Sequence, residues 1–313
     1  MVSRRVIVDV DTGVDDYLAL LILFYAEKLN LIKIEAITCT YGNTSLNNVC
    51  KNTLRLLEIL QRRDIPVLKG CDDQALIPHE RNLPTYFGAD GFGGLNVDFE
   101  PQQSVGEMSA SVGMCDIVLK HRNKVSIICL GPLTNLAVAL RLYSSFASNI
   151  RDIWIMGGNY SGNESNYSVK PEFNFGTDPE AAHIVLKCAK CPIYLLPWET
   201  CLKQSVTMEW RNTLHCSNLA MELLTKAEKQ VINESEMYYL PCDAFLTFAF
   251  LNAEKHVSDI IAHSAAVEVR DDSKRGQVII QDNKVAESKN VLFITGINEK
   301  LFKKFIEELD QEL

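Results

Sequence analysis

Short apolar runs recur along the chain and are separated by longer segments in which apolar residues return every three or four positions. The short runs predict buried strands, at 6–8, 34–39, 65–68, 125–130, 153–156 and 192–196. The longer segments predict helices between them, at 17–26, 45–60, 110–121, 136–143 and from 179 onward. Repeated strand-then-helix units predict an α/β fold, with a doubly wound, mostly parallel sheet and helices on both faces.

The last third of the chain departs from this alternation. Residues 208–240 are helical and unusually polar, as expected of an excursion packed beside the sheet and over its edge. A helix at 241–250 precedes three short strands, which we expect to be antiparallel, and the final helix: 265–269, 277–280, 291–294 and 298–312. Because no repeat, low-complexity segment or linker interrupts the pattern, we expect a single domain over residues 1–313.

The longest irregular stretch is 70–103, and it contains the glycine-rich segment 87–94. A loop of this length in a compact domain is usually either functional or disordered. Its glycines do not form a GxGxxG pattern behind a strand, so the sequence does not predict a dinucleotide site.

Composition narrows the class of partner. The 313 residues are 47% hydrophobic, which is enough for a sizeable core, and the net charge of −9 argues against nucleic acid or an anionic membrane as partners. A neutral or cationic small molecule is the better substrate class.

The cysteines and the apolar segments bear on location. The ten cysteines form no disulfide framework, and the apolar run after Arg4-Arg5 is too short for a signal peptide, so we expect reduced thiols and a cytoplasmic location. The apolar segment 17–26 is too short to span a bilayer and is expected to be a core helix. Cys188 and Cys191 form a CxxC without a second pair, and we interpret them as structural rather than as zinc ligands.

An acidic loop, residues 9–16, follows the first predicted strand. Its four carboxylates, Asp9, Asp11, Asp15 and Asp16, lie where open α/β sheets bind ligands, at the carboxyl end of a strand. A helix dipole stabilises each nearby carboxylate by only about 0.3–1 kcal/mol, which does not offset the repulsion among four. Helix capping alone explains one aspartate, whereas four at this spacing favour a bound hard cation, calcium or magnesium. Gly13 permits a tight or positive-φ turn that folds the carboxylates inward.

Four distant segments together resemble the inosine-uridine-preferring nucleoside hydrolases: the acidic loop, Gly131 to Asn135, the acidic and polar segment 172–182, and Cys242-Asp243. The resemblance covers nearly the whole chain. It implies a calcium-dependent hydrolase that cuts the N-glycosidic bond of ribonucleosides. It also implies a homo-oligomer, either a dimer or a tetramer, with a small-molecule ribonucleoside substrate.

The resemblance also implies roles for individual residues. Calcium would be held by Asp11, Asp16, Asp243 and the backbone carbonyl of Thr134, with Asp11 also acting as the general base on the attacking water. The ribose hydroxyls would be contacted by a set of polar side chains: Asp15, Asn43, Asn166, Glu172, Asn174 and Asp243. Asn163 is an alternative to Asn166 at the 5′-hydroxyl.

One position departs from the family pattern. Many members place a histidine before the late aspartate as the acid for the leaving group, whereas this chain has Cys242 and resembles the cysteine-bearing branch. The thiol either donates a proton or only packs against the substrate. Tyr238, Tyr239 and Trp198 are further candidates to stack on the base or supply a proton, although aromatic residues are more often part of a core.

Two other functions remain to be weighed. A haloacid-dehalogenase-like phosphatase also begins with a strand followed by Asp-x-Asp, but it would leave Asp15 and Asp16 without a role. A calcium-dependent nucleoside-binding protein without catalysis would not need to retain Asp11. The sequence leaves purine against pyrimidine preference open, because the base pocket would be built from the segments 70–103 and 208–240.

Overall fold

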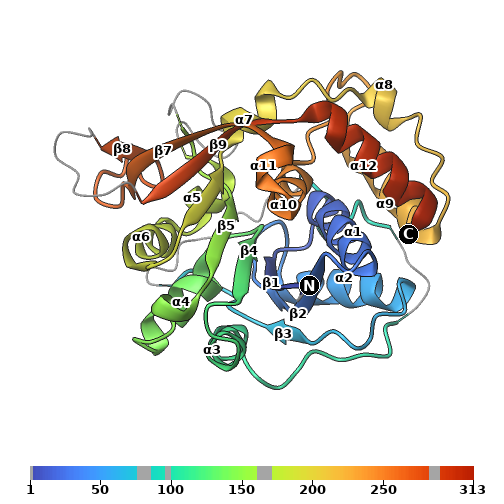
Figure 1. The fold of residues 1–313 in the computed structure, drawn as a ribbon. Helices are drawn as coiled ribbons and strands as arrows, with labels where there is room; N and C mark the ends of the chain where they lie inside the picture. Colours follow the sequence, from blue (N-terminus) through green and yellow to red (C-terminus); the bar gives the residue numbers. More distant parts are fainter. Residues whose placement is uncertain (1–2, 76–85, 96–99, 161–170, 282–289) are drawn as a thin grey trace.

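A single mixed sheet organises the chain in the computed structural model, which describes residues 3–75, 86–95, 100–160, 171–281 and 290–313 (Figure 1). Within these residues nine strands lie in the order β3-β2-β1-β4-β5-β6-β9-β7-β8. Their bounds are β1 Arg4–Val10, β2 Ile32–Cys39, β3 Val67–Lys69, β4 Val125–Cys129, β5 Asp152–Met156, β6 Ile193–Leu196, β7 Val257–Val267, β8 Val278–Gln281 and β9 Val291–Ile297. The first six strands pair in parallel, as the strand-then-helix alternation predicts.

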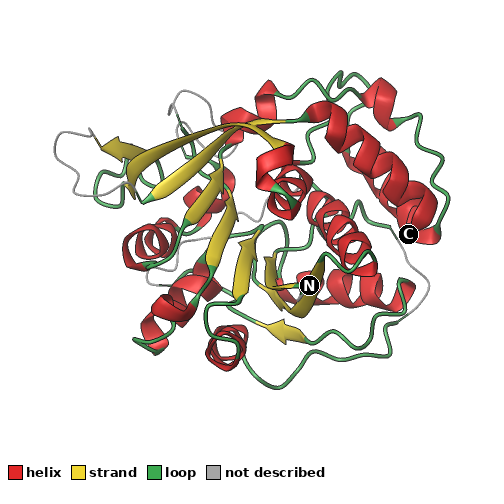
Figure 2. Cartoon of the chain, viewed as in Figure 1, coloured by secondary structure: helices red, strands yellow, loops and turns green. Residues whose placement is uncertain are grey.

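Helices cover both faces of the sheet (Figure 2). The longer ones are α1 Val14–Lys28, α2 Leu46–Ile59, α3 Ala110–Lys120, α4 Thr134–Leu142, α6 Pro179–Cys188, α9 Leu219–Val231, α10 Cys242–Leu251 and α12 Glu299–Glu312. The shorter ones are α5 Phe173–Thr177, α7 Trp198–Lys203, α8 Met208–Arg211 and α11 Ala253–His256, with a 3₁₀ turn at Ala147–Asn149.

The alternation of side chains along β1 divides the core into two layers. Val6, Val8 and Val10 pack with α1, α2, α9, α10 and α12 on one face, whereas Ile7 packs with α3, α4 and α6 on the other. α1 lies inside the first layer, and its residues from Tyr17 to Ala26 are all buried. The predicted core helix is thereby confirmed. Among the described helices, none combines the length and the apolar character that crossing a membrane requires.

The C-terminal strands differ from the prediction. β9 pairs in parallel with β6 and antiparallel with β7, so it lies between them instead of in an all-antiparallel group. β7 begins at Val257, well before the predicted start, and none of its residues before Ser264 is buried, so this half lacks the buried face by which a strand is recognised. The polar excursion contains α8 and α9, and α9 packs on α1 and α2 instead of at the edge of the sheet.

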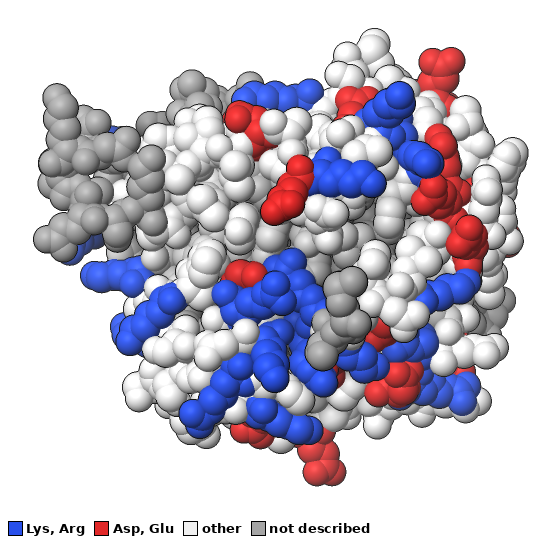
Figure 3. Space-filling view, viewed as in Figure 1, with Lys and Arg blue, Asp and Glu red and all other residues white. Residues whose placement is uncertain are grey.

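Charge is distributed unevenly over the surface. On the face shown in Figure 3, lysine and arginine side chains gather below the centre, although the chain as a whole is acidic. Arg5, Lys120 and Lys124 all act on His121 at the end of α3, where burial and these cations lower the pKa of the imidazole. All ten cysteines, including Cys188 and Cys191, are free thiols, as expected.

Candidate functional site

The acidic loop connects β1 to α1 at the carboxyl edge of the parallel strands (Figure 1). β1 ends at Val10, and Gly13 caps the first turn of α1 in an extended conformation. Of the two turns expected at Gly13, a tight one or one with positive φ, its φ of −97° excludes the second. Glycine is required there for space: a Cβ would lie 2.7 Å from Phe87 Cδ2 and 2.8 Å from Asn43 Nδ2.

Hydrogen bonds fold the carboxylates inward. The Asp16 carboxylate accepts hydrogen bonds from the backbone N–H of Asp11 at 3.2 Å and of Gly13 at 2.9 Å. Asn43 joins two of the acids, because its N–H donates to Asp11 Oδ2 at 2.8 Å and its Nδ2 donates to Asp16 Oδ2 at 3.2 Å. The structure therefore brings Asn43 to the acidic loop, as predicted.

Asp11 has one buried oxygen that remains available. Its Oδ1 has no hydrogen-bond partner among the described residues, and the side chain is only 1% exposed. The backbone of Gly131 lies so close to this oxygen that a Cβ there would be 2.6 Å away, and a Cβ on Gly42 would lie closer still to Oδ2. A buried acceptor without a partner is costly, so this oxygen points to a ligand or an ion.

Asp243, at the start of α10, completes the cluster. Oxygens of Asp15, Asp16 and Asp243 lie within 4.8 Å of one another, and Asp11 interacts electrostatically with both Asp16 and Asp243. Burial is the largest cause that raises the pKa of all four carboxyls, to about 8 for Asp15 and about 6 for Asp16. Because these donors are all oxygens, the cluster fits a hard cation such as calcium.

The turn at 131–135 is tied to this edge by two side chains. Thr134, the first residue of α4, donates from Oγ1 to Asp178 Oδ2 at 2.7 Å. Asp178 also accepts from Ala181 N at 3.0 Å, which confirms the predicted N-cap of α6. Asn135 Nδ2 donates to Asp9 Oδ1 at 2.8 Å and to Cys39 O at 3.0 Å, so it joins the ends of β1 and β2. This bond between Asp9 and Asn135 was not predicted, because the two residues are far apart in the sequence.

Glu172 and Asn174 are buried beside the ends of β4 and β5. Glu172 caps α5 by accepting from the N–H groups of Asn174 at 2.9 Å and Phe175 at 3.2 Å. Burial raises the pKa of Glu172 to about 7. Asn174 Nδ2 donates to Leu130 O at 2.7 Å, and its Oδ1 has no partner in the described part of the chain, which leaves an acceptor for a ligand. Asn163 and Asn166 lie outside the described residues.

Cys242 is the first residue of α10 and is 4% exposed. Its Sγ donates to Leu240 O at 3.5 Å and also interacts with the thiol of Cys201. The hydrogen bond with Cys201, burial and nearby carboxylates raise the pKa of Cys242 well above its ordinary value. The group is therefore a neutral thiol at physiological pH.

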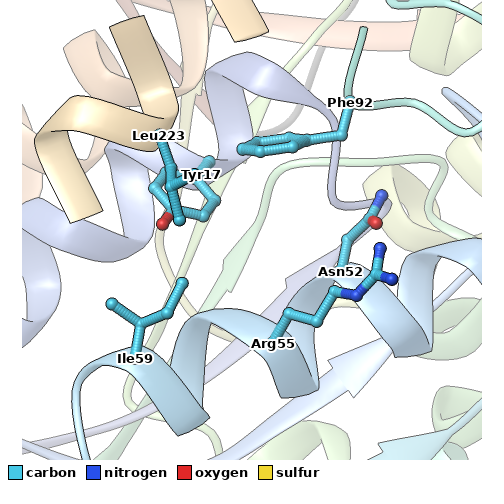
Figure 4. Close-up of a pocket in the computed structure, with 6 residues that line it drawn as sticks. All are labelled: Tyr17, Asn52, Arg55, Ile59, Phe92 and Leu223. Atoms are coloured by element: carbon cyan, nitrogen blue, oxygen red, sulfur yellow. The ribbon is translucent and has the colours of Figure 1, made fainter. Parts of the chain in front are cut away.

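The aromatic residues near the site differ in exposure. Tyr239 is buried and donates to Glu228 Oε1 at 2.5 Å, so it is not placed to stack on a base. Tyr86, which the sequence did not single out, is 68% exposed, and its ring packs edge-on against Phe87 with centroids 4.9 Å apart. A small pocket nearby, lined by α1, α2, α9 and Phe92, shows how Phe92 packs on Tyr17 (Figure 4).

Comparison with known proteins agrees with the site. The family model described as inosine-uridine preferring nucleoside hydrolase matches residues 6–304. The chain is 34% identical over 182 residues to uridine nucleosidase 1 of Arabidopsis thaliana, covering 58% of this chain and 53% of that protein. It is 33% identical over 183 residues to the inosine-uridine preferring nucleoside hydrolase of Leishmania major, covering 58% and 56%. The matched region thus spans about half the length of these curated relatives.

A solved structure extends the likeness over the full chain. The fold superimposes on an inosine-guanosine nucleoside hydrolase with a TM-score of 0.89 and 26% identity, covering 99% of each chain.

Proposed function

The chain belongs to the inosine-uridine-preferring nucleoside hydrolase family, and from that premise we propose that it is a calcium-dependent hydrolase of ribonucleosides. The reaction breaks the N-glycosidic bond with water and releases the free base and ribose. Two observations carry this proposal: the Oδ1 of Asp11 is buried and unpartnered among the described residues, and its carboxyl interacts electrostatically with the cluster of Asp15, Asp16 and Asp243. Such a cluster suits a hard cation and a polyhydroxylated ligand.

Calcium would be held by Asp11, Asp16, Asp243 and the carbonyl of Thr134, where its charge would offset the carboxylates and make a neighbouring water more acidic. Asp15 is a further donor in the same cluster. Three of the four proposed ligands are held in place by visible contacts, and Asp11 is fixed by the N–H of Asn43. Asp16 is fixed by Gly13 and Asn43, and Thr134 is fixed by Asp178.

Asp11 takes the proton from the attacking water, because its free Oδ1 is the acceptor that faces the cluster. Water then adds to the anomeric carbon on the face opposite the base, so the configuration at that carbon is inverted. As the bond to the base breaks, positive charge develops on the ribose ring. The surrounding carboxylates stabilise this charge.

The ribose hydroxyls are bound by Asp15, Asn43, Asn166, Glu172, Asn174 and Asp243. Asn174 offers a free carbonyl oxygen, whereas the carboxylate of Glu172 already accepts three backbone hydrogen bonds. Glu172 can therefore accept a ribose hydroxyl only through its remaining lone pairs, and its cap also fixes the backbone of Asn174.

A reducing-sugar assay tests the proposal. The substrates are inosine, adenosine, uridine, cytidine and their 2′-deoxy forms, each with calcium and with a chelator. We expect ribose release from at least one ribonucleoside, loss of activity in the chelator, and much slower cleavage of the deoxy forms. Cleavage of deoxyribonucleosides at the same rate in EDTA would contradict the proposal.

The two rival functions have weaker support. Hydrolysis of p-nitrophenyl phosphate with magnesium, and of no ribonucleoside, would favour the phosphatase. Binding of ribonucleosides in a calorimeter without ribose release would favour the non-catalytic binding protein. Neither is suggested by the relatives that the chain resembles.

We further propose that the protein is a cytoplasmic homo-oligomer, either a dimer or a tetramer. Light scattering coupled to size-exclusion chromatography distinguishes these assemblies from the 35.2 kDa monomer. A single species at the monomer mass would contradict this part of the proposal.

A further inference from the structure

The proposed reaction needs a proton for the departing base, and the described residues near the acidic cluster include no histidine to supply it. His183 and His256 are each engaged with a backbone carbonyl elsewhere, at Val267 and Phe248. Cys242 occupies the position that the family pattern gives to a histidine, but its thiol hydrogen is directed to Leu240 O. Among the residues that the structure describes, the proton donor is therefore a group other than a histidine or Cys242.

The loop of residues 86–95 is built onto the acidic site by specific hydrogen bonds. Asn52 Nδ2, on α2, donates to both Thr12 O at 3.1 Å and Asp90 O at 2.9 Å, so one side chain joins this loop to the acidic loop. Thr44 Oγ1 donates to Ala89 O at 2.8 Å. These bonds fix the positions of Ala89 and Asp90 relative to the acidic loop.

The same segment packs on the acidic loop through its aromatic side chains. Phe87 Cδ2 lies so close to Gly13 that a Cβ there would be 2.7 Å away, and the Phe92 ring lies 4.9 Å from that of Tyr17 on α1 (Figure 4). Tyr86 stands edge-on to Phe87, with an angle of 72° between the rings. The Tyr86 ring is thereby held at the mouth of the site.

The phenol of Tyr86 also interacts with charged and polar groups of the site. It interacts electrostatically with Asp15 in the acidic loop, with Cys242 at the start of α10 and with Glu236. The segment that contains Glu236 is held in place by two backbone hydrogen bonds. Tyr239 N donates to Val206 O at 2.7 Å, and Met208 N donates to Met237 O at 3.0 Å. The packing of Tyr86 on Phe87, and of Phe87 against Gly13, together with these interactions places the phenol at the acidic loop.

We propose that Tyr86 is a catalytic residue whose hydroxyl donates a proton to the departing base. This inference rests on the proposed function. The C–N glycosidic bond breaks, its electron pair passes to the base, and a ring nitrogen of the base takes the proton from Tyr86 Oη. The oxygen of water bonds to the anomeric carbon, and Asp11 takes the proton that the water loses.

The enzyme then returns to its starting state by exchange with solvent. The exposed phenolate of Tyr86 regains a proton from water, and Asp11 releases one. The net reaction consumes one water and leaves both residues unchanged. Cys242 packs beside the reacting bond in this scheme and does not transfer a proton.

The test compares Tyr86→Phe with the parent enzyme on two substrates, a natural ribonucleoside that the enzyme cleaves and p-nitrophenyl riboside. The second leaving group departs as a stable anion and needs no proton. General-acid catalysis typically contributes 10²–10⁴-fold. We therefore expect kcat on the ribonucleoside to fall on the order of 100-fold or more, and the ratio of the two rates to change by a similar factor.

Controls separate proton donation from other roles. Tyr143→Phe, at an exposed tyrosine after α4, should leave the ratio unchanged, and Tyr86→His should recover part of the lost kcat. The melting temperature of Tyr86→Phe should match that of the parent, because the side chain is 68% exposed.

The outcomes distinguish this inference from the proposed function. A rise in KM on both substrates with kcat unchanged would assign Tyr86 to binding and overturn proton donation. An unchanged rate ratio would overturn the inference while the parent activity upheld the function. A parent enzyme that cleaves neither substrate would refute the proposed function itself.

Discussion

Asp11 is held by contacts that leave one oxygen free for chemistry. Asn43 N–H occupies Oδ2, whereas Oδ1 is buried and has no partner among the residues that the structure describes. The neighbouring glycine backbones prevent the side chain from turning away. An oxygen placed in this way can bind a cation and accept a proton, which are the two roles that the family resemblance assigns to it.

We predict that Asp11→Ala abolishes ribose release, because the variant loses both the proton acceptor and a proposed calcium ligand. The measurement is kcat by reducing-sugar assay, together with circular dichroism to verify folding. Asp116→Ala removes an exposed carboxylate on α3 and should retain full activity. Measurable turnover in folded Asp11→Ala, above about one hundredth of the parent rate, would exclude the assigned role of general base.

We predict that Cys242→Ala slows a ribonucleoside and p-nitrophenyl riboside by the same modest factor. The thiol is neutral and bonded to Leu240 O, so its loss leaves a small cavity next to Asp243 without removing a proton donor. The measurement is the ratio of kcat values on the two substrates. If Cys242→Ala slows hydrolysis of the ribonucleoside more than that of p-nitrophenyl riboside, the thiol is a proton donor and the prediction is wrong.

At the scale of elements, Asp178 links three segments through one carboxylate. It caps α6, accepts from Thr134 Oγ1 at the start of α4, and accepts from Ala75 N at 2.8 Å. The cap was predictable because Asp-Pro at a helix start is a local signal. The bond to Thr134 was not, because it joins residues that are distant in sequence.

We predict that Asp178→Ala lowers the free energy of unfolding by about 1–3 kcal/mol, from the lost cap and the unpaired donors of Thr134 and Ala75. It should also weaken calcium binding, because Thr134 is no longer held. Urea denaturation and calorimetric titration measure the two effects. Asn298→Ala, which removes the cap of α12 alone, should destabilise by about 1 kcal/mol and leave calcium affinity unchanged. Equal calcium affinity in both variants would show that Thr134 does not depend on Asp178.

The regular elements and the acidic site could be predicted because their signals are local. Apolar runs identified the parallel strands, and the acidic loop indicated where the carboxylates gather. Asp9 of that loop bonds Thr38 and Asn135 instead of joining the cluster, and Asp243 was assigned only through the family resemblance. The order of the strands near the C-terminus could not be predicted from the sequence. β9 pairs with both β6 and β7, and this pairing depends on contacts between residues that are far apart in the sequence.

The missed residues share a different cause. Arg211 forms a buried ion pair with Glu228 at 2.6 Å, and Glu228 accepts from Tyr239, but three separate segments supply this cluster. Tyr86 escaped attention because a tyrosine before a glycine-rich loop has no distinctive spacing. Its significance comes from Asn52, which brings the loop to the acidic site.

At the scale of the whole molecule, the four clustered carboxylates join β1, α1 and α10, so their repulsion opposes the packing of one core layer. Asp11 directly follows β1, Asp15 and Asp16 lie in the first turn of α1, and Asp243 is the second residue of α10. α1 and α10 contact each other extensively in the same layer. A cation between these elements would therefore stabilise the fold as well as the site.

We predict that calcium raises the melting temperature of the protein, and that EDTA both lowers it and abolishes turnover. An ion that binds only the folded state adds about 2.7 kcal/mol to stability when its free concentration is roughly 100 times its dissociation constant. Differential scanning calorimetry across a calcium series measures the shift, with magnesium as the comparison ion. Asp243→Asn should lose the shift because it removes one charge from the cluster, whereas Asp116→Asn should keep it. The prediction is wrong if the enzyme releases ribose while its melting temperature responds to neither calcium nor EDTA. That result would show that the carboxylates act without a metal ion. The raised pKa values of the four carboxyls would then reflect shared protons instead of an ion-binding site.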